Sequence, residues 1–196
     1  MELIIRKISA QIQPLYSASA HYQHTIWSHV LRVSQYAKDF AMATQANEFV
    51  CVAGGLLHDI GAAMYGREDH HITGSKEAVA VLLSCECPVE LIGPIVSTIY
   101  SHRGSQRLPF KTQEAICVAA ADAKDHFTDL EELWMVHERD LHLPPMWIHR
   151  KVSDKLQRDW EKTDSAIKGL LGDAYEKAKK ELLRIAHRNG GAVGRK

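Results

Sequence analysis

Histidine and aspartate residues interrupt apolar stretches of this sequence, at positions where a helix would bury its side chains. In LLHDIG, residues 56–61, His58 and Asp59 follow a run of apolar and small residues. Burying an ionised carboxylate costs several kcal/mol, or an equivalent pKa shift, unless a charged group or a metal ion compensates it. Imidazole and carboxylate groups are common ligands of transition-metal ions. The pair therefore indicates a metal site, provided that other segments supply matching groups.

Three further polar side chains interrupt apolar faces elsewhere in the chain. His29 lies three residues after Ile26 and four before Val33, which places the three on one face of a helix. His102 continues the apolar stripe of residues 92, 95 and 99, and Asp122 lies inside AICVAAADA, residues 115–123. Together with the first pair, these groups could share metal ions, which would remove the cost of burying them.

Each of these residues also has a simpler interpretation when it is taken alone. A single histidine on an apolar face is more often a hydrogen-bonded core residue than a metal ligand. Asp122 could cap a helix or pair with Lys124. The hypothesis of a metal site therefore depends on the whole set and on its order along the chain.

The spacing of apolar residues predicts the helices that must position these groups. Helices are expected over residues of about 24–43, 47–59, 73–83, 94–102 and 112–127, and one or two more between about 152 and 187. Gly61 is expected to cap the second helix at its C-terminus, and Pro88 and Pro94 are expected to lie near helix starts. No alternation with a period of two is bounded by hairpin turns, so no strand is predicted. The predicted fold class is all-α.

Composition limits the functions that are plausible. The 196 residues include 24 Lys and Arg and 24 Asp and Glu, so we expect neither a nucleic acid polymer nor an anionic membrane as a partner. No apolar run is long enough to span a bilayer, and no signal-peptide pattern is found, which makes a cytoplasmic protein the expectation. The four cysteines lie among apolar residues and are expected to be reduced core residues.

The order of the polar groups resembles the HD-domain superfamily of metal-dependent phosphohydrolases over about residues 20–130. The resemblance is carried by His29 in HVLRVSQYA, His58–Asp59 in LLHDIG and Asp122 in AAADAKD. It implies a helical bundle in which these four residues hold a first divalent metal ion. Asp59 and His58 would then be the catalytic residues.

Two further histidines resemble the additional ligands of the dinuclear branch of this superfamily. They are His71 in HHITGSKEA and His102 in IYSHRG. The resemblance implies that both would help to hold a second ion and that Asp59 would bridge the two ions. His and carboxylate ligands favour Fe, Mn, Co or Zn, with Mg possible, so the expected cofactor is one or two such ions. Two ions would supply a hydroxide for in-line attack on phosphorus.

Two of these assignments have alternatives. His70 could replace His71, but His71 lies three residues before Gly74, as in the H-x-x-G pattern of the family, and is preferred. Asp125 competes with Asp122, which ends the apolar run and has the better spacing.

The residues that would bind the substrate phosphate are less clearly marked. Many relatives have a lysine after HDIG, where this chain has Ala62, so the positive charge must come from elsewhere. Arg103 is the preferred phosphate contact, because a guanidinium matches phosphate oxygens bidentately. Arg107 and Lys124 are further candidates.

The predicted function is hydrolysis of a small phosphate substrate, with a nucleotide or a related phosphate ester or anhydride preferred. Residues 1–140 would form the HD-type hydrolase domain. Residues 141–196 would form a C-terminal helical extension, packed on the core or in contact with a second subunit of a homodimer, with a disordered tail from about residue 190. Alternatives within the same fold are a di-iron oxygenase and a non-catalytic module that binds a nucleotide or a metal. Fold alone does not decide between them.

Overall fold

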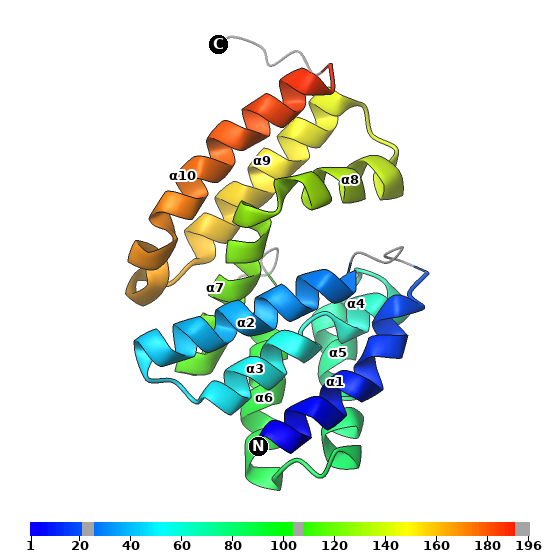
Figure 1. Ribbon diagram of the computed structural model, residues 1–196, viewed down its shortest axis with the longest axis vertical. Coiled ribbons are helices and arrows are strands. Elements are labelled where there is room, and N and C mark those ends of the chain that lie inside the picture. Colours follow the sequence, from blue (N-terminus) through cyan, green and yellow to red (C-terminus); the bar gives the residue numbers. More distant parts are fainter. Residues whose placement is uncertain (21–25, 104–107, 191–196) are drawn as a thin grey trace. The chain divides into compact units, whose positions relative to one another are not determined.

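A computed structural model describes residues 1–20, 26–103 and 108–190 (Figure 1). Helices α1 to α10 account for the regular structure, and no strand occurs in these ranges, which confirms the predicted all-α class. The chain divides into two compact units, Met1–Asp122 and Ala123–Lys196, which we describe separately. The division between the units falls within α7 (Gln113–Thr128), and the boundary near residue 140 that the sequence suggests stays a prediction.

The N-terminal unit is built around α3. Its elements are α1 (Glu2–Ser17), α2 (Ile26–Thr44), α3 (Glu48–Leu57), α4 (Ile60–Tyr65), α5 (His70–Ser84), α6 (Val89–Ser101) and the first part of α7 (Gln113–Thr128). Helix α3 contacts α1, α2 and α6 and buries most of its side chains (Figure 1). Its first turn is capped by Asn47, whose side chain accepts a hydrogen bond of 3.2 Å from the Val50 amide.

Helix α1 covers this core, although no helix is predicted for its segment from the sequence. Ile8, Ile12 and Tyr16 are four residues apart and fully buried, as expected for the inner stripe of an amphipathic helix. Each buried side chain of this size stabilises the fold by about 1.5–3 kcal/mol. The Tyr16 hydroxyl donates a hydrogen bond of 3.0 Å to the Leu56 carbonyl, which ties α1 to the last turn of α3.

Two glycines allow close packing between helices, at the end of α3 against α2 and at the start of α4 against α5. A Cβ atom at Gly55 would lie 2.7 Å from the Cα atom of Ser34 on α2. A Cβ atom at Gly61 would meet the backbone of His70 and Gly74 on α5 even more closely. Any larger residue would force these helices apart, so both glycines are needed for close approach.

The observed helix ends differ from the predicted ones at two places. Helix α3 ends at Leu57, and α4 begins at Ile60, so Gly61 lies inside α4 and is not a C-cap. Helix α6 begins at Val89, directly after Pro88, and Pro94 lies inside it. Proline inside a helix leaves the carbonyl four residues earlier without its amide partner. That carbonyl belongs to Glu90, an exposed residue.

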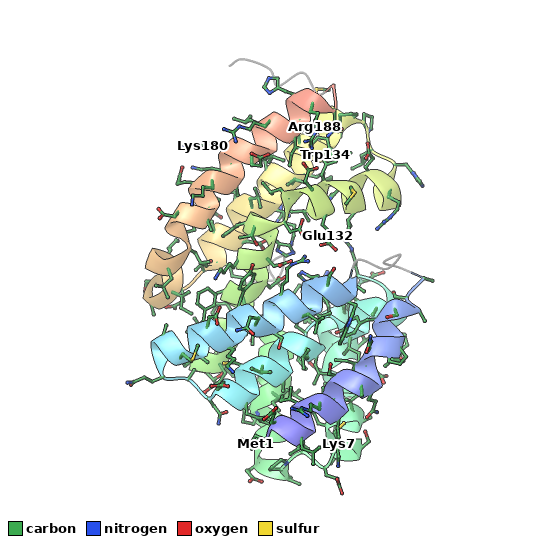
Figure 2. All side chains as sticks on the ribbon, viewed as in Figure 1. Met1, Lys7, Glu132, Trp134, Lys180 and Arg188 are labelled. Carbon is green, nitrogen blue, oxygen red and sulfur yellow. The ribbon has the colours of Figure 1, made fainter. Side chains whose placement is uncertain are left out.

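The C-terminal unit contains the end of α7 together with α8 (Leu130–Leu141), α9 (Pro145–Lys162) and α10 (Ser165–Arg188). Helix α9 contacts both α8 and α10. The apolar stripe predicted from the sequence for α10 is largely buried, and Trp134 of α8 is also buried (Figure 2). Trp160 of α9 stacks on Tyr175 of α10, with ring centroids 4.7 Å apart and planes 2° from parallel. The segment of α8 was not predicted as a helix.

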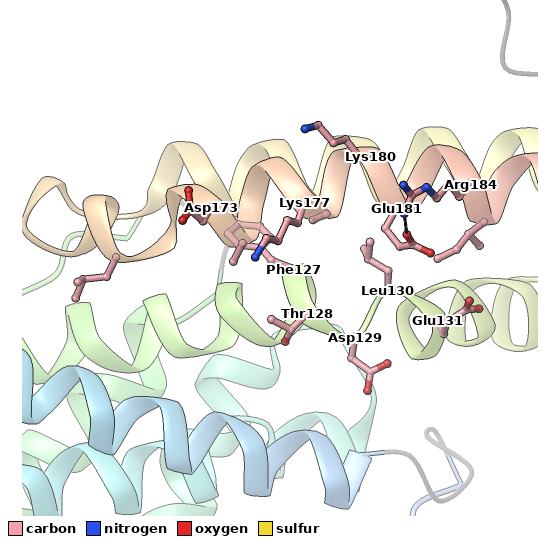
Figure 3. A pocket seen from close by; sticks show the side chains of 14 residues that line it. Phe127, Thr128, Asp129, Leu130, Glu131, Asp173, Lys177, Lys180, Glu181 and Arg184 are labelled. Atoms are coloured by element: carbon pink, nitrogen blue, oxygen red, sulfur yellow. Dashed lines mark hydrogen bonds and ion pairs between the residues drawn. The ribbon is translucent and has the colours of Figure 1, made fainter.

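A groove of about 720 Å³ runs along α10 in this unit (Figure 3). Its other wall comes from the end of α7 and the start of α8. Charges of both signs line it, and Glu181 and Arg184 pair with each other at 2.9 Å. None of the described residues predicted as site residues lines this groove.

Two predictions from composition can be compared with the structure. The four cysteines are buried and form no disulfide, as predicted. Among the described residues, no single helix has both the length and the apolar character needed to cross a membrane. The segments Glu48–Tyr65 and His70–Ser84 meet that test only as a pair, and they are bent by 113° relative to each other.

Candidate metal centre

Six side chains from helix ends and helix faces converge in the N-terminal unit. Helix α2 carries His29 near its start, and the connection between α3 and α4 carries His58 and Asp59. The remaining members are His70 at the start of α5, His102 directly after α6, and Asp122 on α7. The convergence brings together five segments that are far apart in the sequence.

The first group of donors consists of His29, His58, Asp59 and Asp122. The Nε2 atoms of the two histidines are 3.1 Å apart. Asp59 Oδ2 lies 3.9 Å from His29 Nε2 and 3.7 Å from His58 Nε2, and Asp122 Oδ1 lies 3.5 Å and 3.8 Å from the same two atoms. When two ligand atoms each lie about 2.1 Å from one ion and the ligand–metal–ligand angle is about 90–109°, the two atoms are about 3.0–3.4 Å apart. The observed distances are close to this range. His29, His58 and Asp59 could together hold a metal ion, and Asp122 lies beside the same two histidine nitrogens.

The second group consists of Asp59, His70 and His102. Asp59 Oδ1 lies 3.5 Å from the Nε2 atom of each histidine, and these two nitrogens are 3.1 Å apart. This group also has a spacing that suits a shared ion. The two oxygens of Asp59 therefore face different groups, Oδ2 the first and Oδ1 the second.

Backbone hydrogen bonds orient three of the imidazole rings in the same way. The Nδ1 atom of His58 lies 2.8 Å from the Gly55 carbonyl, and that of His102 lies 2.6 Å from the Ile99 carbonyl. Both carbonyls belong to the last turn of a helix, where carbonyls lack intrahelical partners. The Nδ1 atom of His70 lies 2.8 Å from the carbonyl of residue 67. Since a carbonyl can only accept, each Nδ1 carries the proton, and each Nε2 keeps the lone pair that a metal ion requires.

The protonation states also suit a metal. Burial lowers the pKa of His58 to about 4, and burial likewise lowers the pKa of His70. Burial alone would raise the pKa of Asp59, but the imidazoles of His58, His102 and His70 outweigh it and hold the pKa well below its ordinary value. At neutral pH these groups are therefore neutral imidazoles and an ionised carboxylate, the forms that bind metal ions.

The structure places His70, and not the preferred His71, beside Asp59 and His102. His71 is buried with its ring against Tyr100, at a centroid distance of 5.4 Å, and its Nδ1 lies 3.3 Å from Arg103 Nη1. The physical reason is the contact of α5 with Gly61, which involves the backbone of His70 and Gly74. Residues four apart share a helix face, so the spacing of four between His70 and Gly74 was the signal that could have favoured His70.

The predicted phosphate-binding residues have different locations. Arg103 follows His102 and is largely buried, with Nη1 3.4 Å from Asp69 Oδ1. Arg107 lies outside the described residues. Lys124 lies on α7 in the C-terminal unit and is partly buried, and Asp125, the alternative to Asp122, is buried in the same unit. Among the described residues, Arg103 is thus the one basic candidate that lies in the N-terminal unit, together with the two groups of donors.

A solved structure with a similar fold extends over nearly the whole chain. It is the crystal structure of a predicted HD superfamily hydrolase from an uncultured Thermotogales bacterium. The two chains are 18% identical and superpose with a TM-score of 0.62 over 93% of this chain and 91% of the other. At this identity the similarity concerns the fold.

A sequence model of the HD domain matches residues 26–126, which is more than half of the 196 residues. The matched segment contains every described member of the two donor groups. HD domains bind divalent metals, and the match supports a metal-dependent phosphohydrolase type of function at the level of the superfamily. By its sequence and its helical fold, this chain belongs to the HD-domain superfamily.

Proposed function

We propose that this protein is a phosphohydrolase with two divalent metal ions and that it acts on a small nucleotide or a related phosphate ester or anhydride. The observation that carries the proposal is the position of Asp59, whose two oxygens face two separate pairs of histidine Nε2 atoms at 3.5–3.9 Å. A carboxylate in this position can serve two ions at once. When bound, such ions supply Lewis acidity and lower the pKa of a coordinated water, which suits attack on phosphorus.

The residues of the chain would contribute orientation and charge. The backbone hydrogen bonds of His58, His70 and His102 hold each ring with Nε2 directed toward Asp59. Since these rings need not reorient when an ion binds, the site is preorganised and its affinity is higher. The mixed nitrogen and oxygen donors favour Fe, Mn, Co or Zn over Mg.

Arg103 is the residue that we propose as the phosphate contact. It follows His102, so its backbone lies beside the second group of donors. Its side chain keeps 19% of its surface exposed, so a substrate can reach it. A guanidinium can donate two parallel hydrogen bonds to a phosphoryl group and stabilise the charge that develops there. The small size of the substrate is inferred from the balance of 24 basic and 24 acidic residues, which offers a polyanion no net attraction.

The first test is replacement of Asp59 by asparagine, which keeps the shape of the side chain and removes its charge. We expect the metal content to fall from about two ions per chain to one or fewer, and hydrolysis to fall by at least about 1000-fold. Elemental analysis of protein purified without chelator gives the metal content. A screen of nucleotides and generic phosphate esters with Mn²⁺ or Fe²⁺ gives the activity.

Two outcomes would contradict the proposal. Full activity of the Asp59→Asn variant would exclude the shared carboxylate as the basis of the reaction. Turnover of an organic substrate that requires O₂, with no hydrolysis of any phosphate ester, would favour an oxygenase on the same fold.

A further inference from the structure

Two adjacent histidines, His70 and His71, have opposite ring environments. The Nδ1 atom of His70 donates to a backbone carbonyl, and its Nε2 faces Asp59. The Nδ1 atom of His71 instead lies 3.3 Å from Nη1 of Arg103. A guanidinium has no acceptor and always donates, so Nδ1 of His71 must accept and the proton of this ring must be on Nε2. His71 is therefore in the opposite tautomer to His58, His70 and His102, whose Nδ1 atoms donate to backbone carbonyls.

We propose that His71 is a positioning residue, which holds the guanidinium of Arg103 beside the His70–His102 pair so that Arg103 binds a phosphoryl oxygen of the substrate. This inference rests on the proposed function, since it assigns a task within the same site. His71 is 5% exposed, and its ring packs against Tyr100, so its orientation is constrained by its surroundings. A held ring can in turn hold the guanidinium.

The chemistry of this contact suits a phosphate-binding arginine. A neutral imidazole accepts a hydrogen bond without neutralising the guanidinium, so this contact, unlike the one with Asp69, leaves the positive charge for the phosphate. A carboxylate in the same place would compete with the substrate for that charge. The imidazole therefore orients Arg103 without lowering its attraction for an anion.

Asp69 also contacts Arg103, but this contact is more exposed than the one with His71. It approaches the same Nη1 atom at 3.4 Å, and its side chain is 61% exposed. An exposed ion pair of this length contributes little to stability, so a phosphate oxygen can replace Asp69. The buried contact with His71 is expected to persist when the substrate binds.

The test compares two replacements of His71. Asparagine keeps an acceptor oxygen near the place of Nδ1, whereas phenylalanine keeps a ring against Tyr100 and has no acceptor. We expect His71→Phe to weaken binding of inorganic phosphate to the Mn²⁺-loaded protein by about 10-fold, and His71→Asn to weaken it by less than about 3-fold. Both variants should keep the metal content of the wild type. Lys76→Ala, which removes an exposed charge from the same helix, is the control and should leave phosphate binding unchanged.

Phosphate affinity is measured by calorimetry, and the tautomers are measured by long-range ¹H–¹⁵N correlation on the Zn²⁺-loaded protein. The His71 signal is identified by its loss in His71→Asn, and we expect its proton on Nε2. Four results would each overturn the inference. The first two are a proton on Nδ1 of His71 and the loss of an ion in His71→Phe. The others are a phosphate affinity of His71→Phe equal to that of Lys76→Ala, and no phosphate binding by the wild type. If the wild type hydrolyses no phosphate ester but its phosphate affinity depends on His71 as described, the proposed function fails and this inference remains.

Discussion

The two groups of donors on either side of Asp59 are held in place by different parts of the structure. In the first group, His29 and Asp122 lie on α2 and α7, within helices whose apolar faces form the core. In the second group, His70 is the first residue of α5 and His102 directly follows the last residue of α6. His58 of the first group also follows a helix end, that of α3, so the first group depends only in part on the packing of whole helices, through His29 and Asp122. Both histidines of the second group depend on where a helix begins or ends. This difference means that the second group should be easier to disturb without unfolding the protein.

The largest effect that would separate the two groups is the loss of one ion at a time. We expect His29→Ala and His70→Ala each to leave about one ion per chain and to lower hydrolysis by roughly 100-fold or more. His70→Ala should remain folded with an unchanged melting temperature in the metal-free form, whereas His29→Ala should melt at a lower temperature, because its helix is part of the core. Elemental analysis and thermal melts of the metal-free variants measure both effects.

The control for this comparison is His187→Ala, which removes an exposed histidine of α10. It should keep two ions and full activity. Two ions in His70→Ala would show that this residue is not a ligand and would break the comparison.

The next effect is the dependence of stability on pH in the metal-free protein. Because burial lowers the pKa of His58 from its ordinary 6.5 to about 4, the unfolded state binds a proton more readily between these values. The contribution of His58 to the free energy of unfolding is fully present above about pH 6.5 and is lost as the pH falls toward 4. The loss is on the order of 3 kcal/mol. The lowered pKa of Asp59 acts in the same direction, and its contribution is lost at lower pH still.

Replacing His58 by glutamine should therefore reduce this loss of unfolding free energy at low pH more than replacing His70 by glutamine does. The reason is that the side chain of His58 is 1% exposed and that of His70 is 13% exposed. Urea unfolding at pH 7.0 and pH 4.5 gives the difference. An equal change in the free energy of unfolding between these two pH values in both variants would show that His58 and His70 do not differ in desolvation.

The smallest effect concerns the contact that positions the second group. A methyl group at Gly61 would meet the backbone of His70 and Gly74, so Gly61→Ala should cost about 1–3 kcal/mol of stability and weaken the second ion selectively. Gly93→Ala is the matched control, because a Cβ atom at this exposed position has nothing within 4 Å, and it should stabilise α6 by about 0.4–1 kcal/mol. Urea unfolding and metal content measure both variants. Wild-type stability of Gly61→Ala would contradict the role of this contact.

Several features could be predicted from the sequence because they depend on local patterns. The helical period of apolar residues predicted α2, α7 and the buried stripe of α10 close to their observed positions. The same period placed His29 and Asp122 on buried faces, where a polar group needs a partner. LLHDIG is a local motif, so its two polar residues could be recognised without knowledge of the fold.

Features that depend on contacts between distant segments could not be predicted in this way. Adjacent residues of a helix point about 100° apart, so the choice between His70 and His71 depends on which face of α5 meets Gly61. The break between α3 and α4 was not predicted either, whereas the start of α6 follows Pro88, which the sequence placed near a helix start. The role that we propose for Arg103 likewise depends on its contact with His71, a residue 32 positions away in the sequence.

By itself, the sequence determined the helical class of this protein, its superfamily and the residue types of a metal centre. These depend on short-range periodicity and on a motif of a few residues. The tertiary structure decided which histidine faces Asp59, how the two oxygens of that carboxylate are divided between two groups of donors, and what holds Arg103. These depend on the directions of side chains from helices that are far apart in the sequence, and only packing sets those directions.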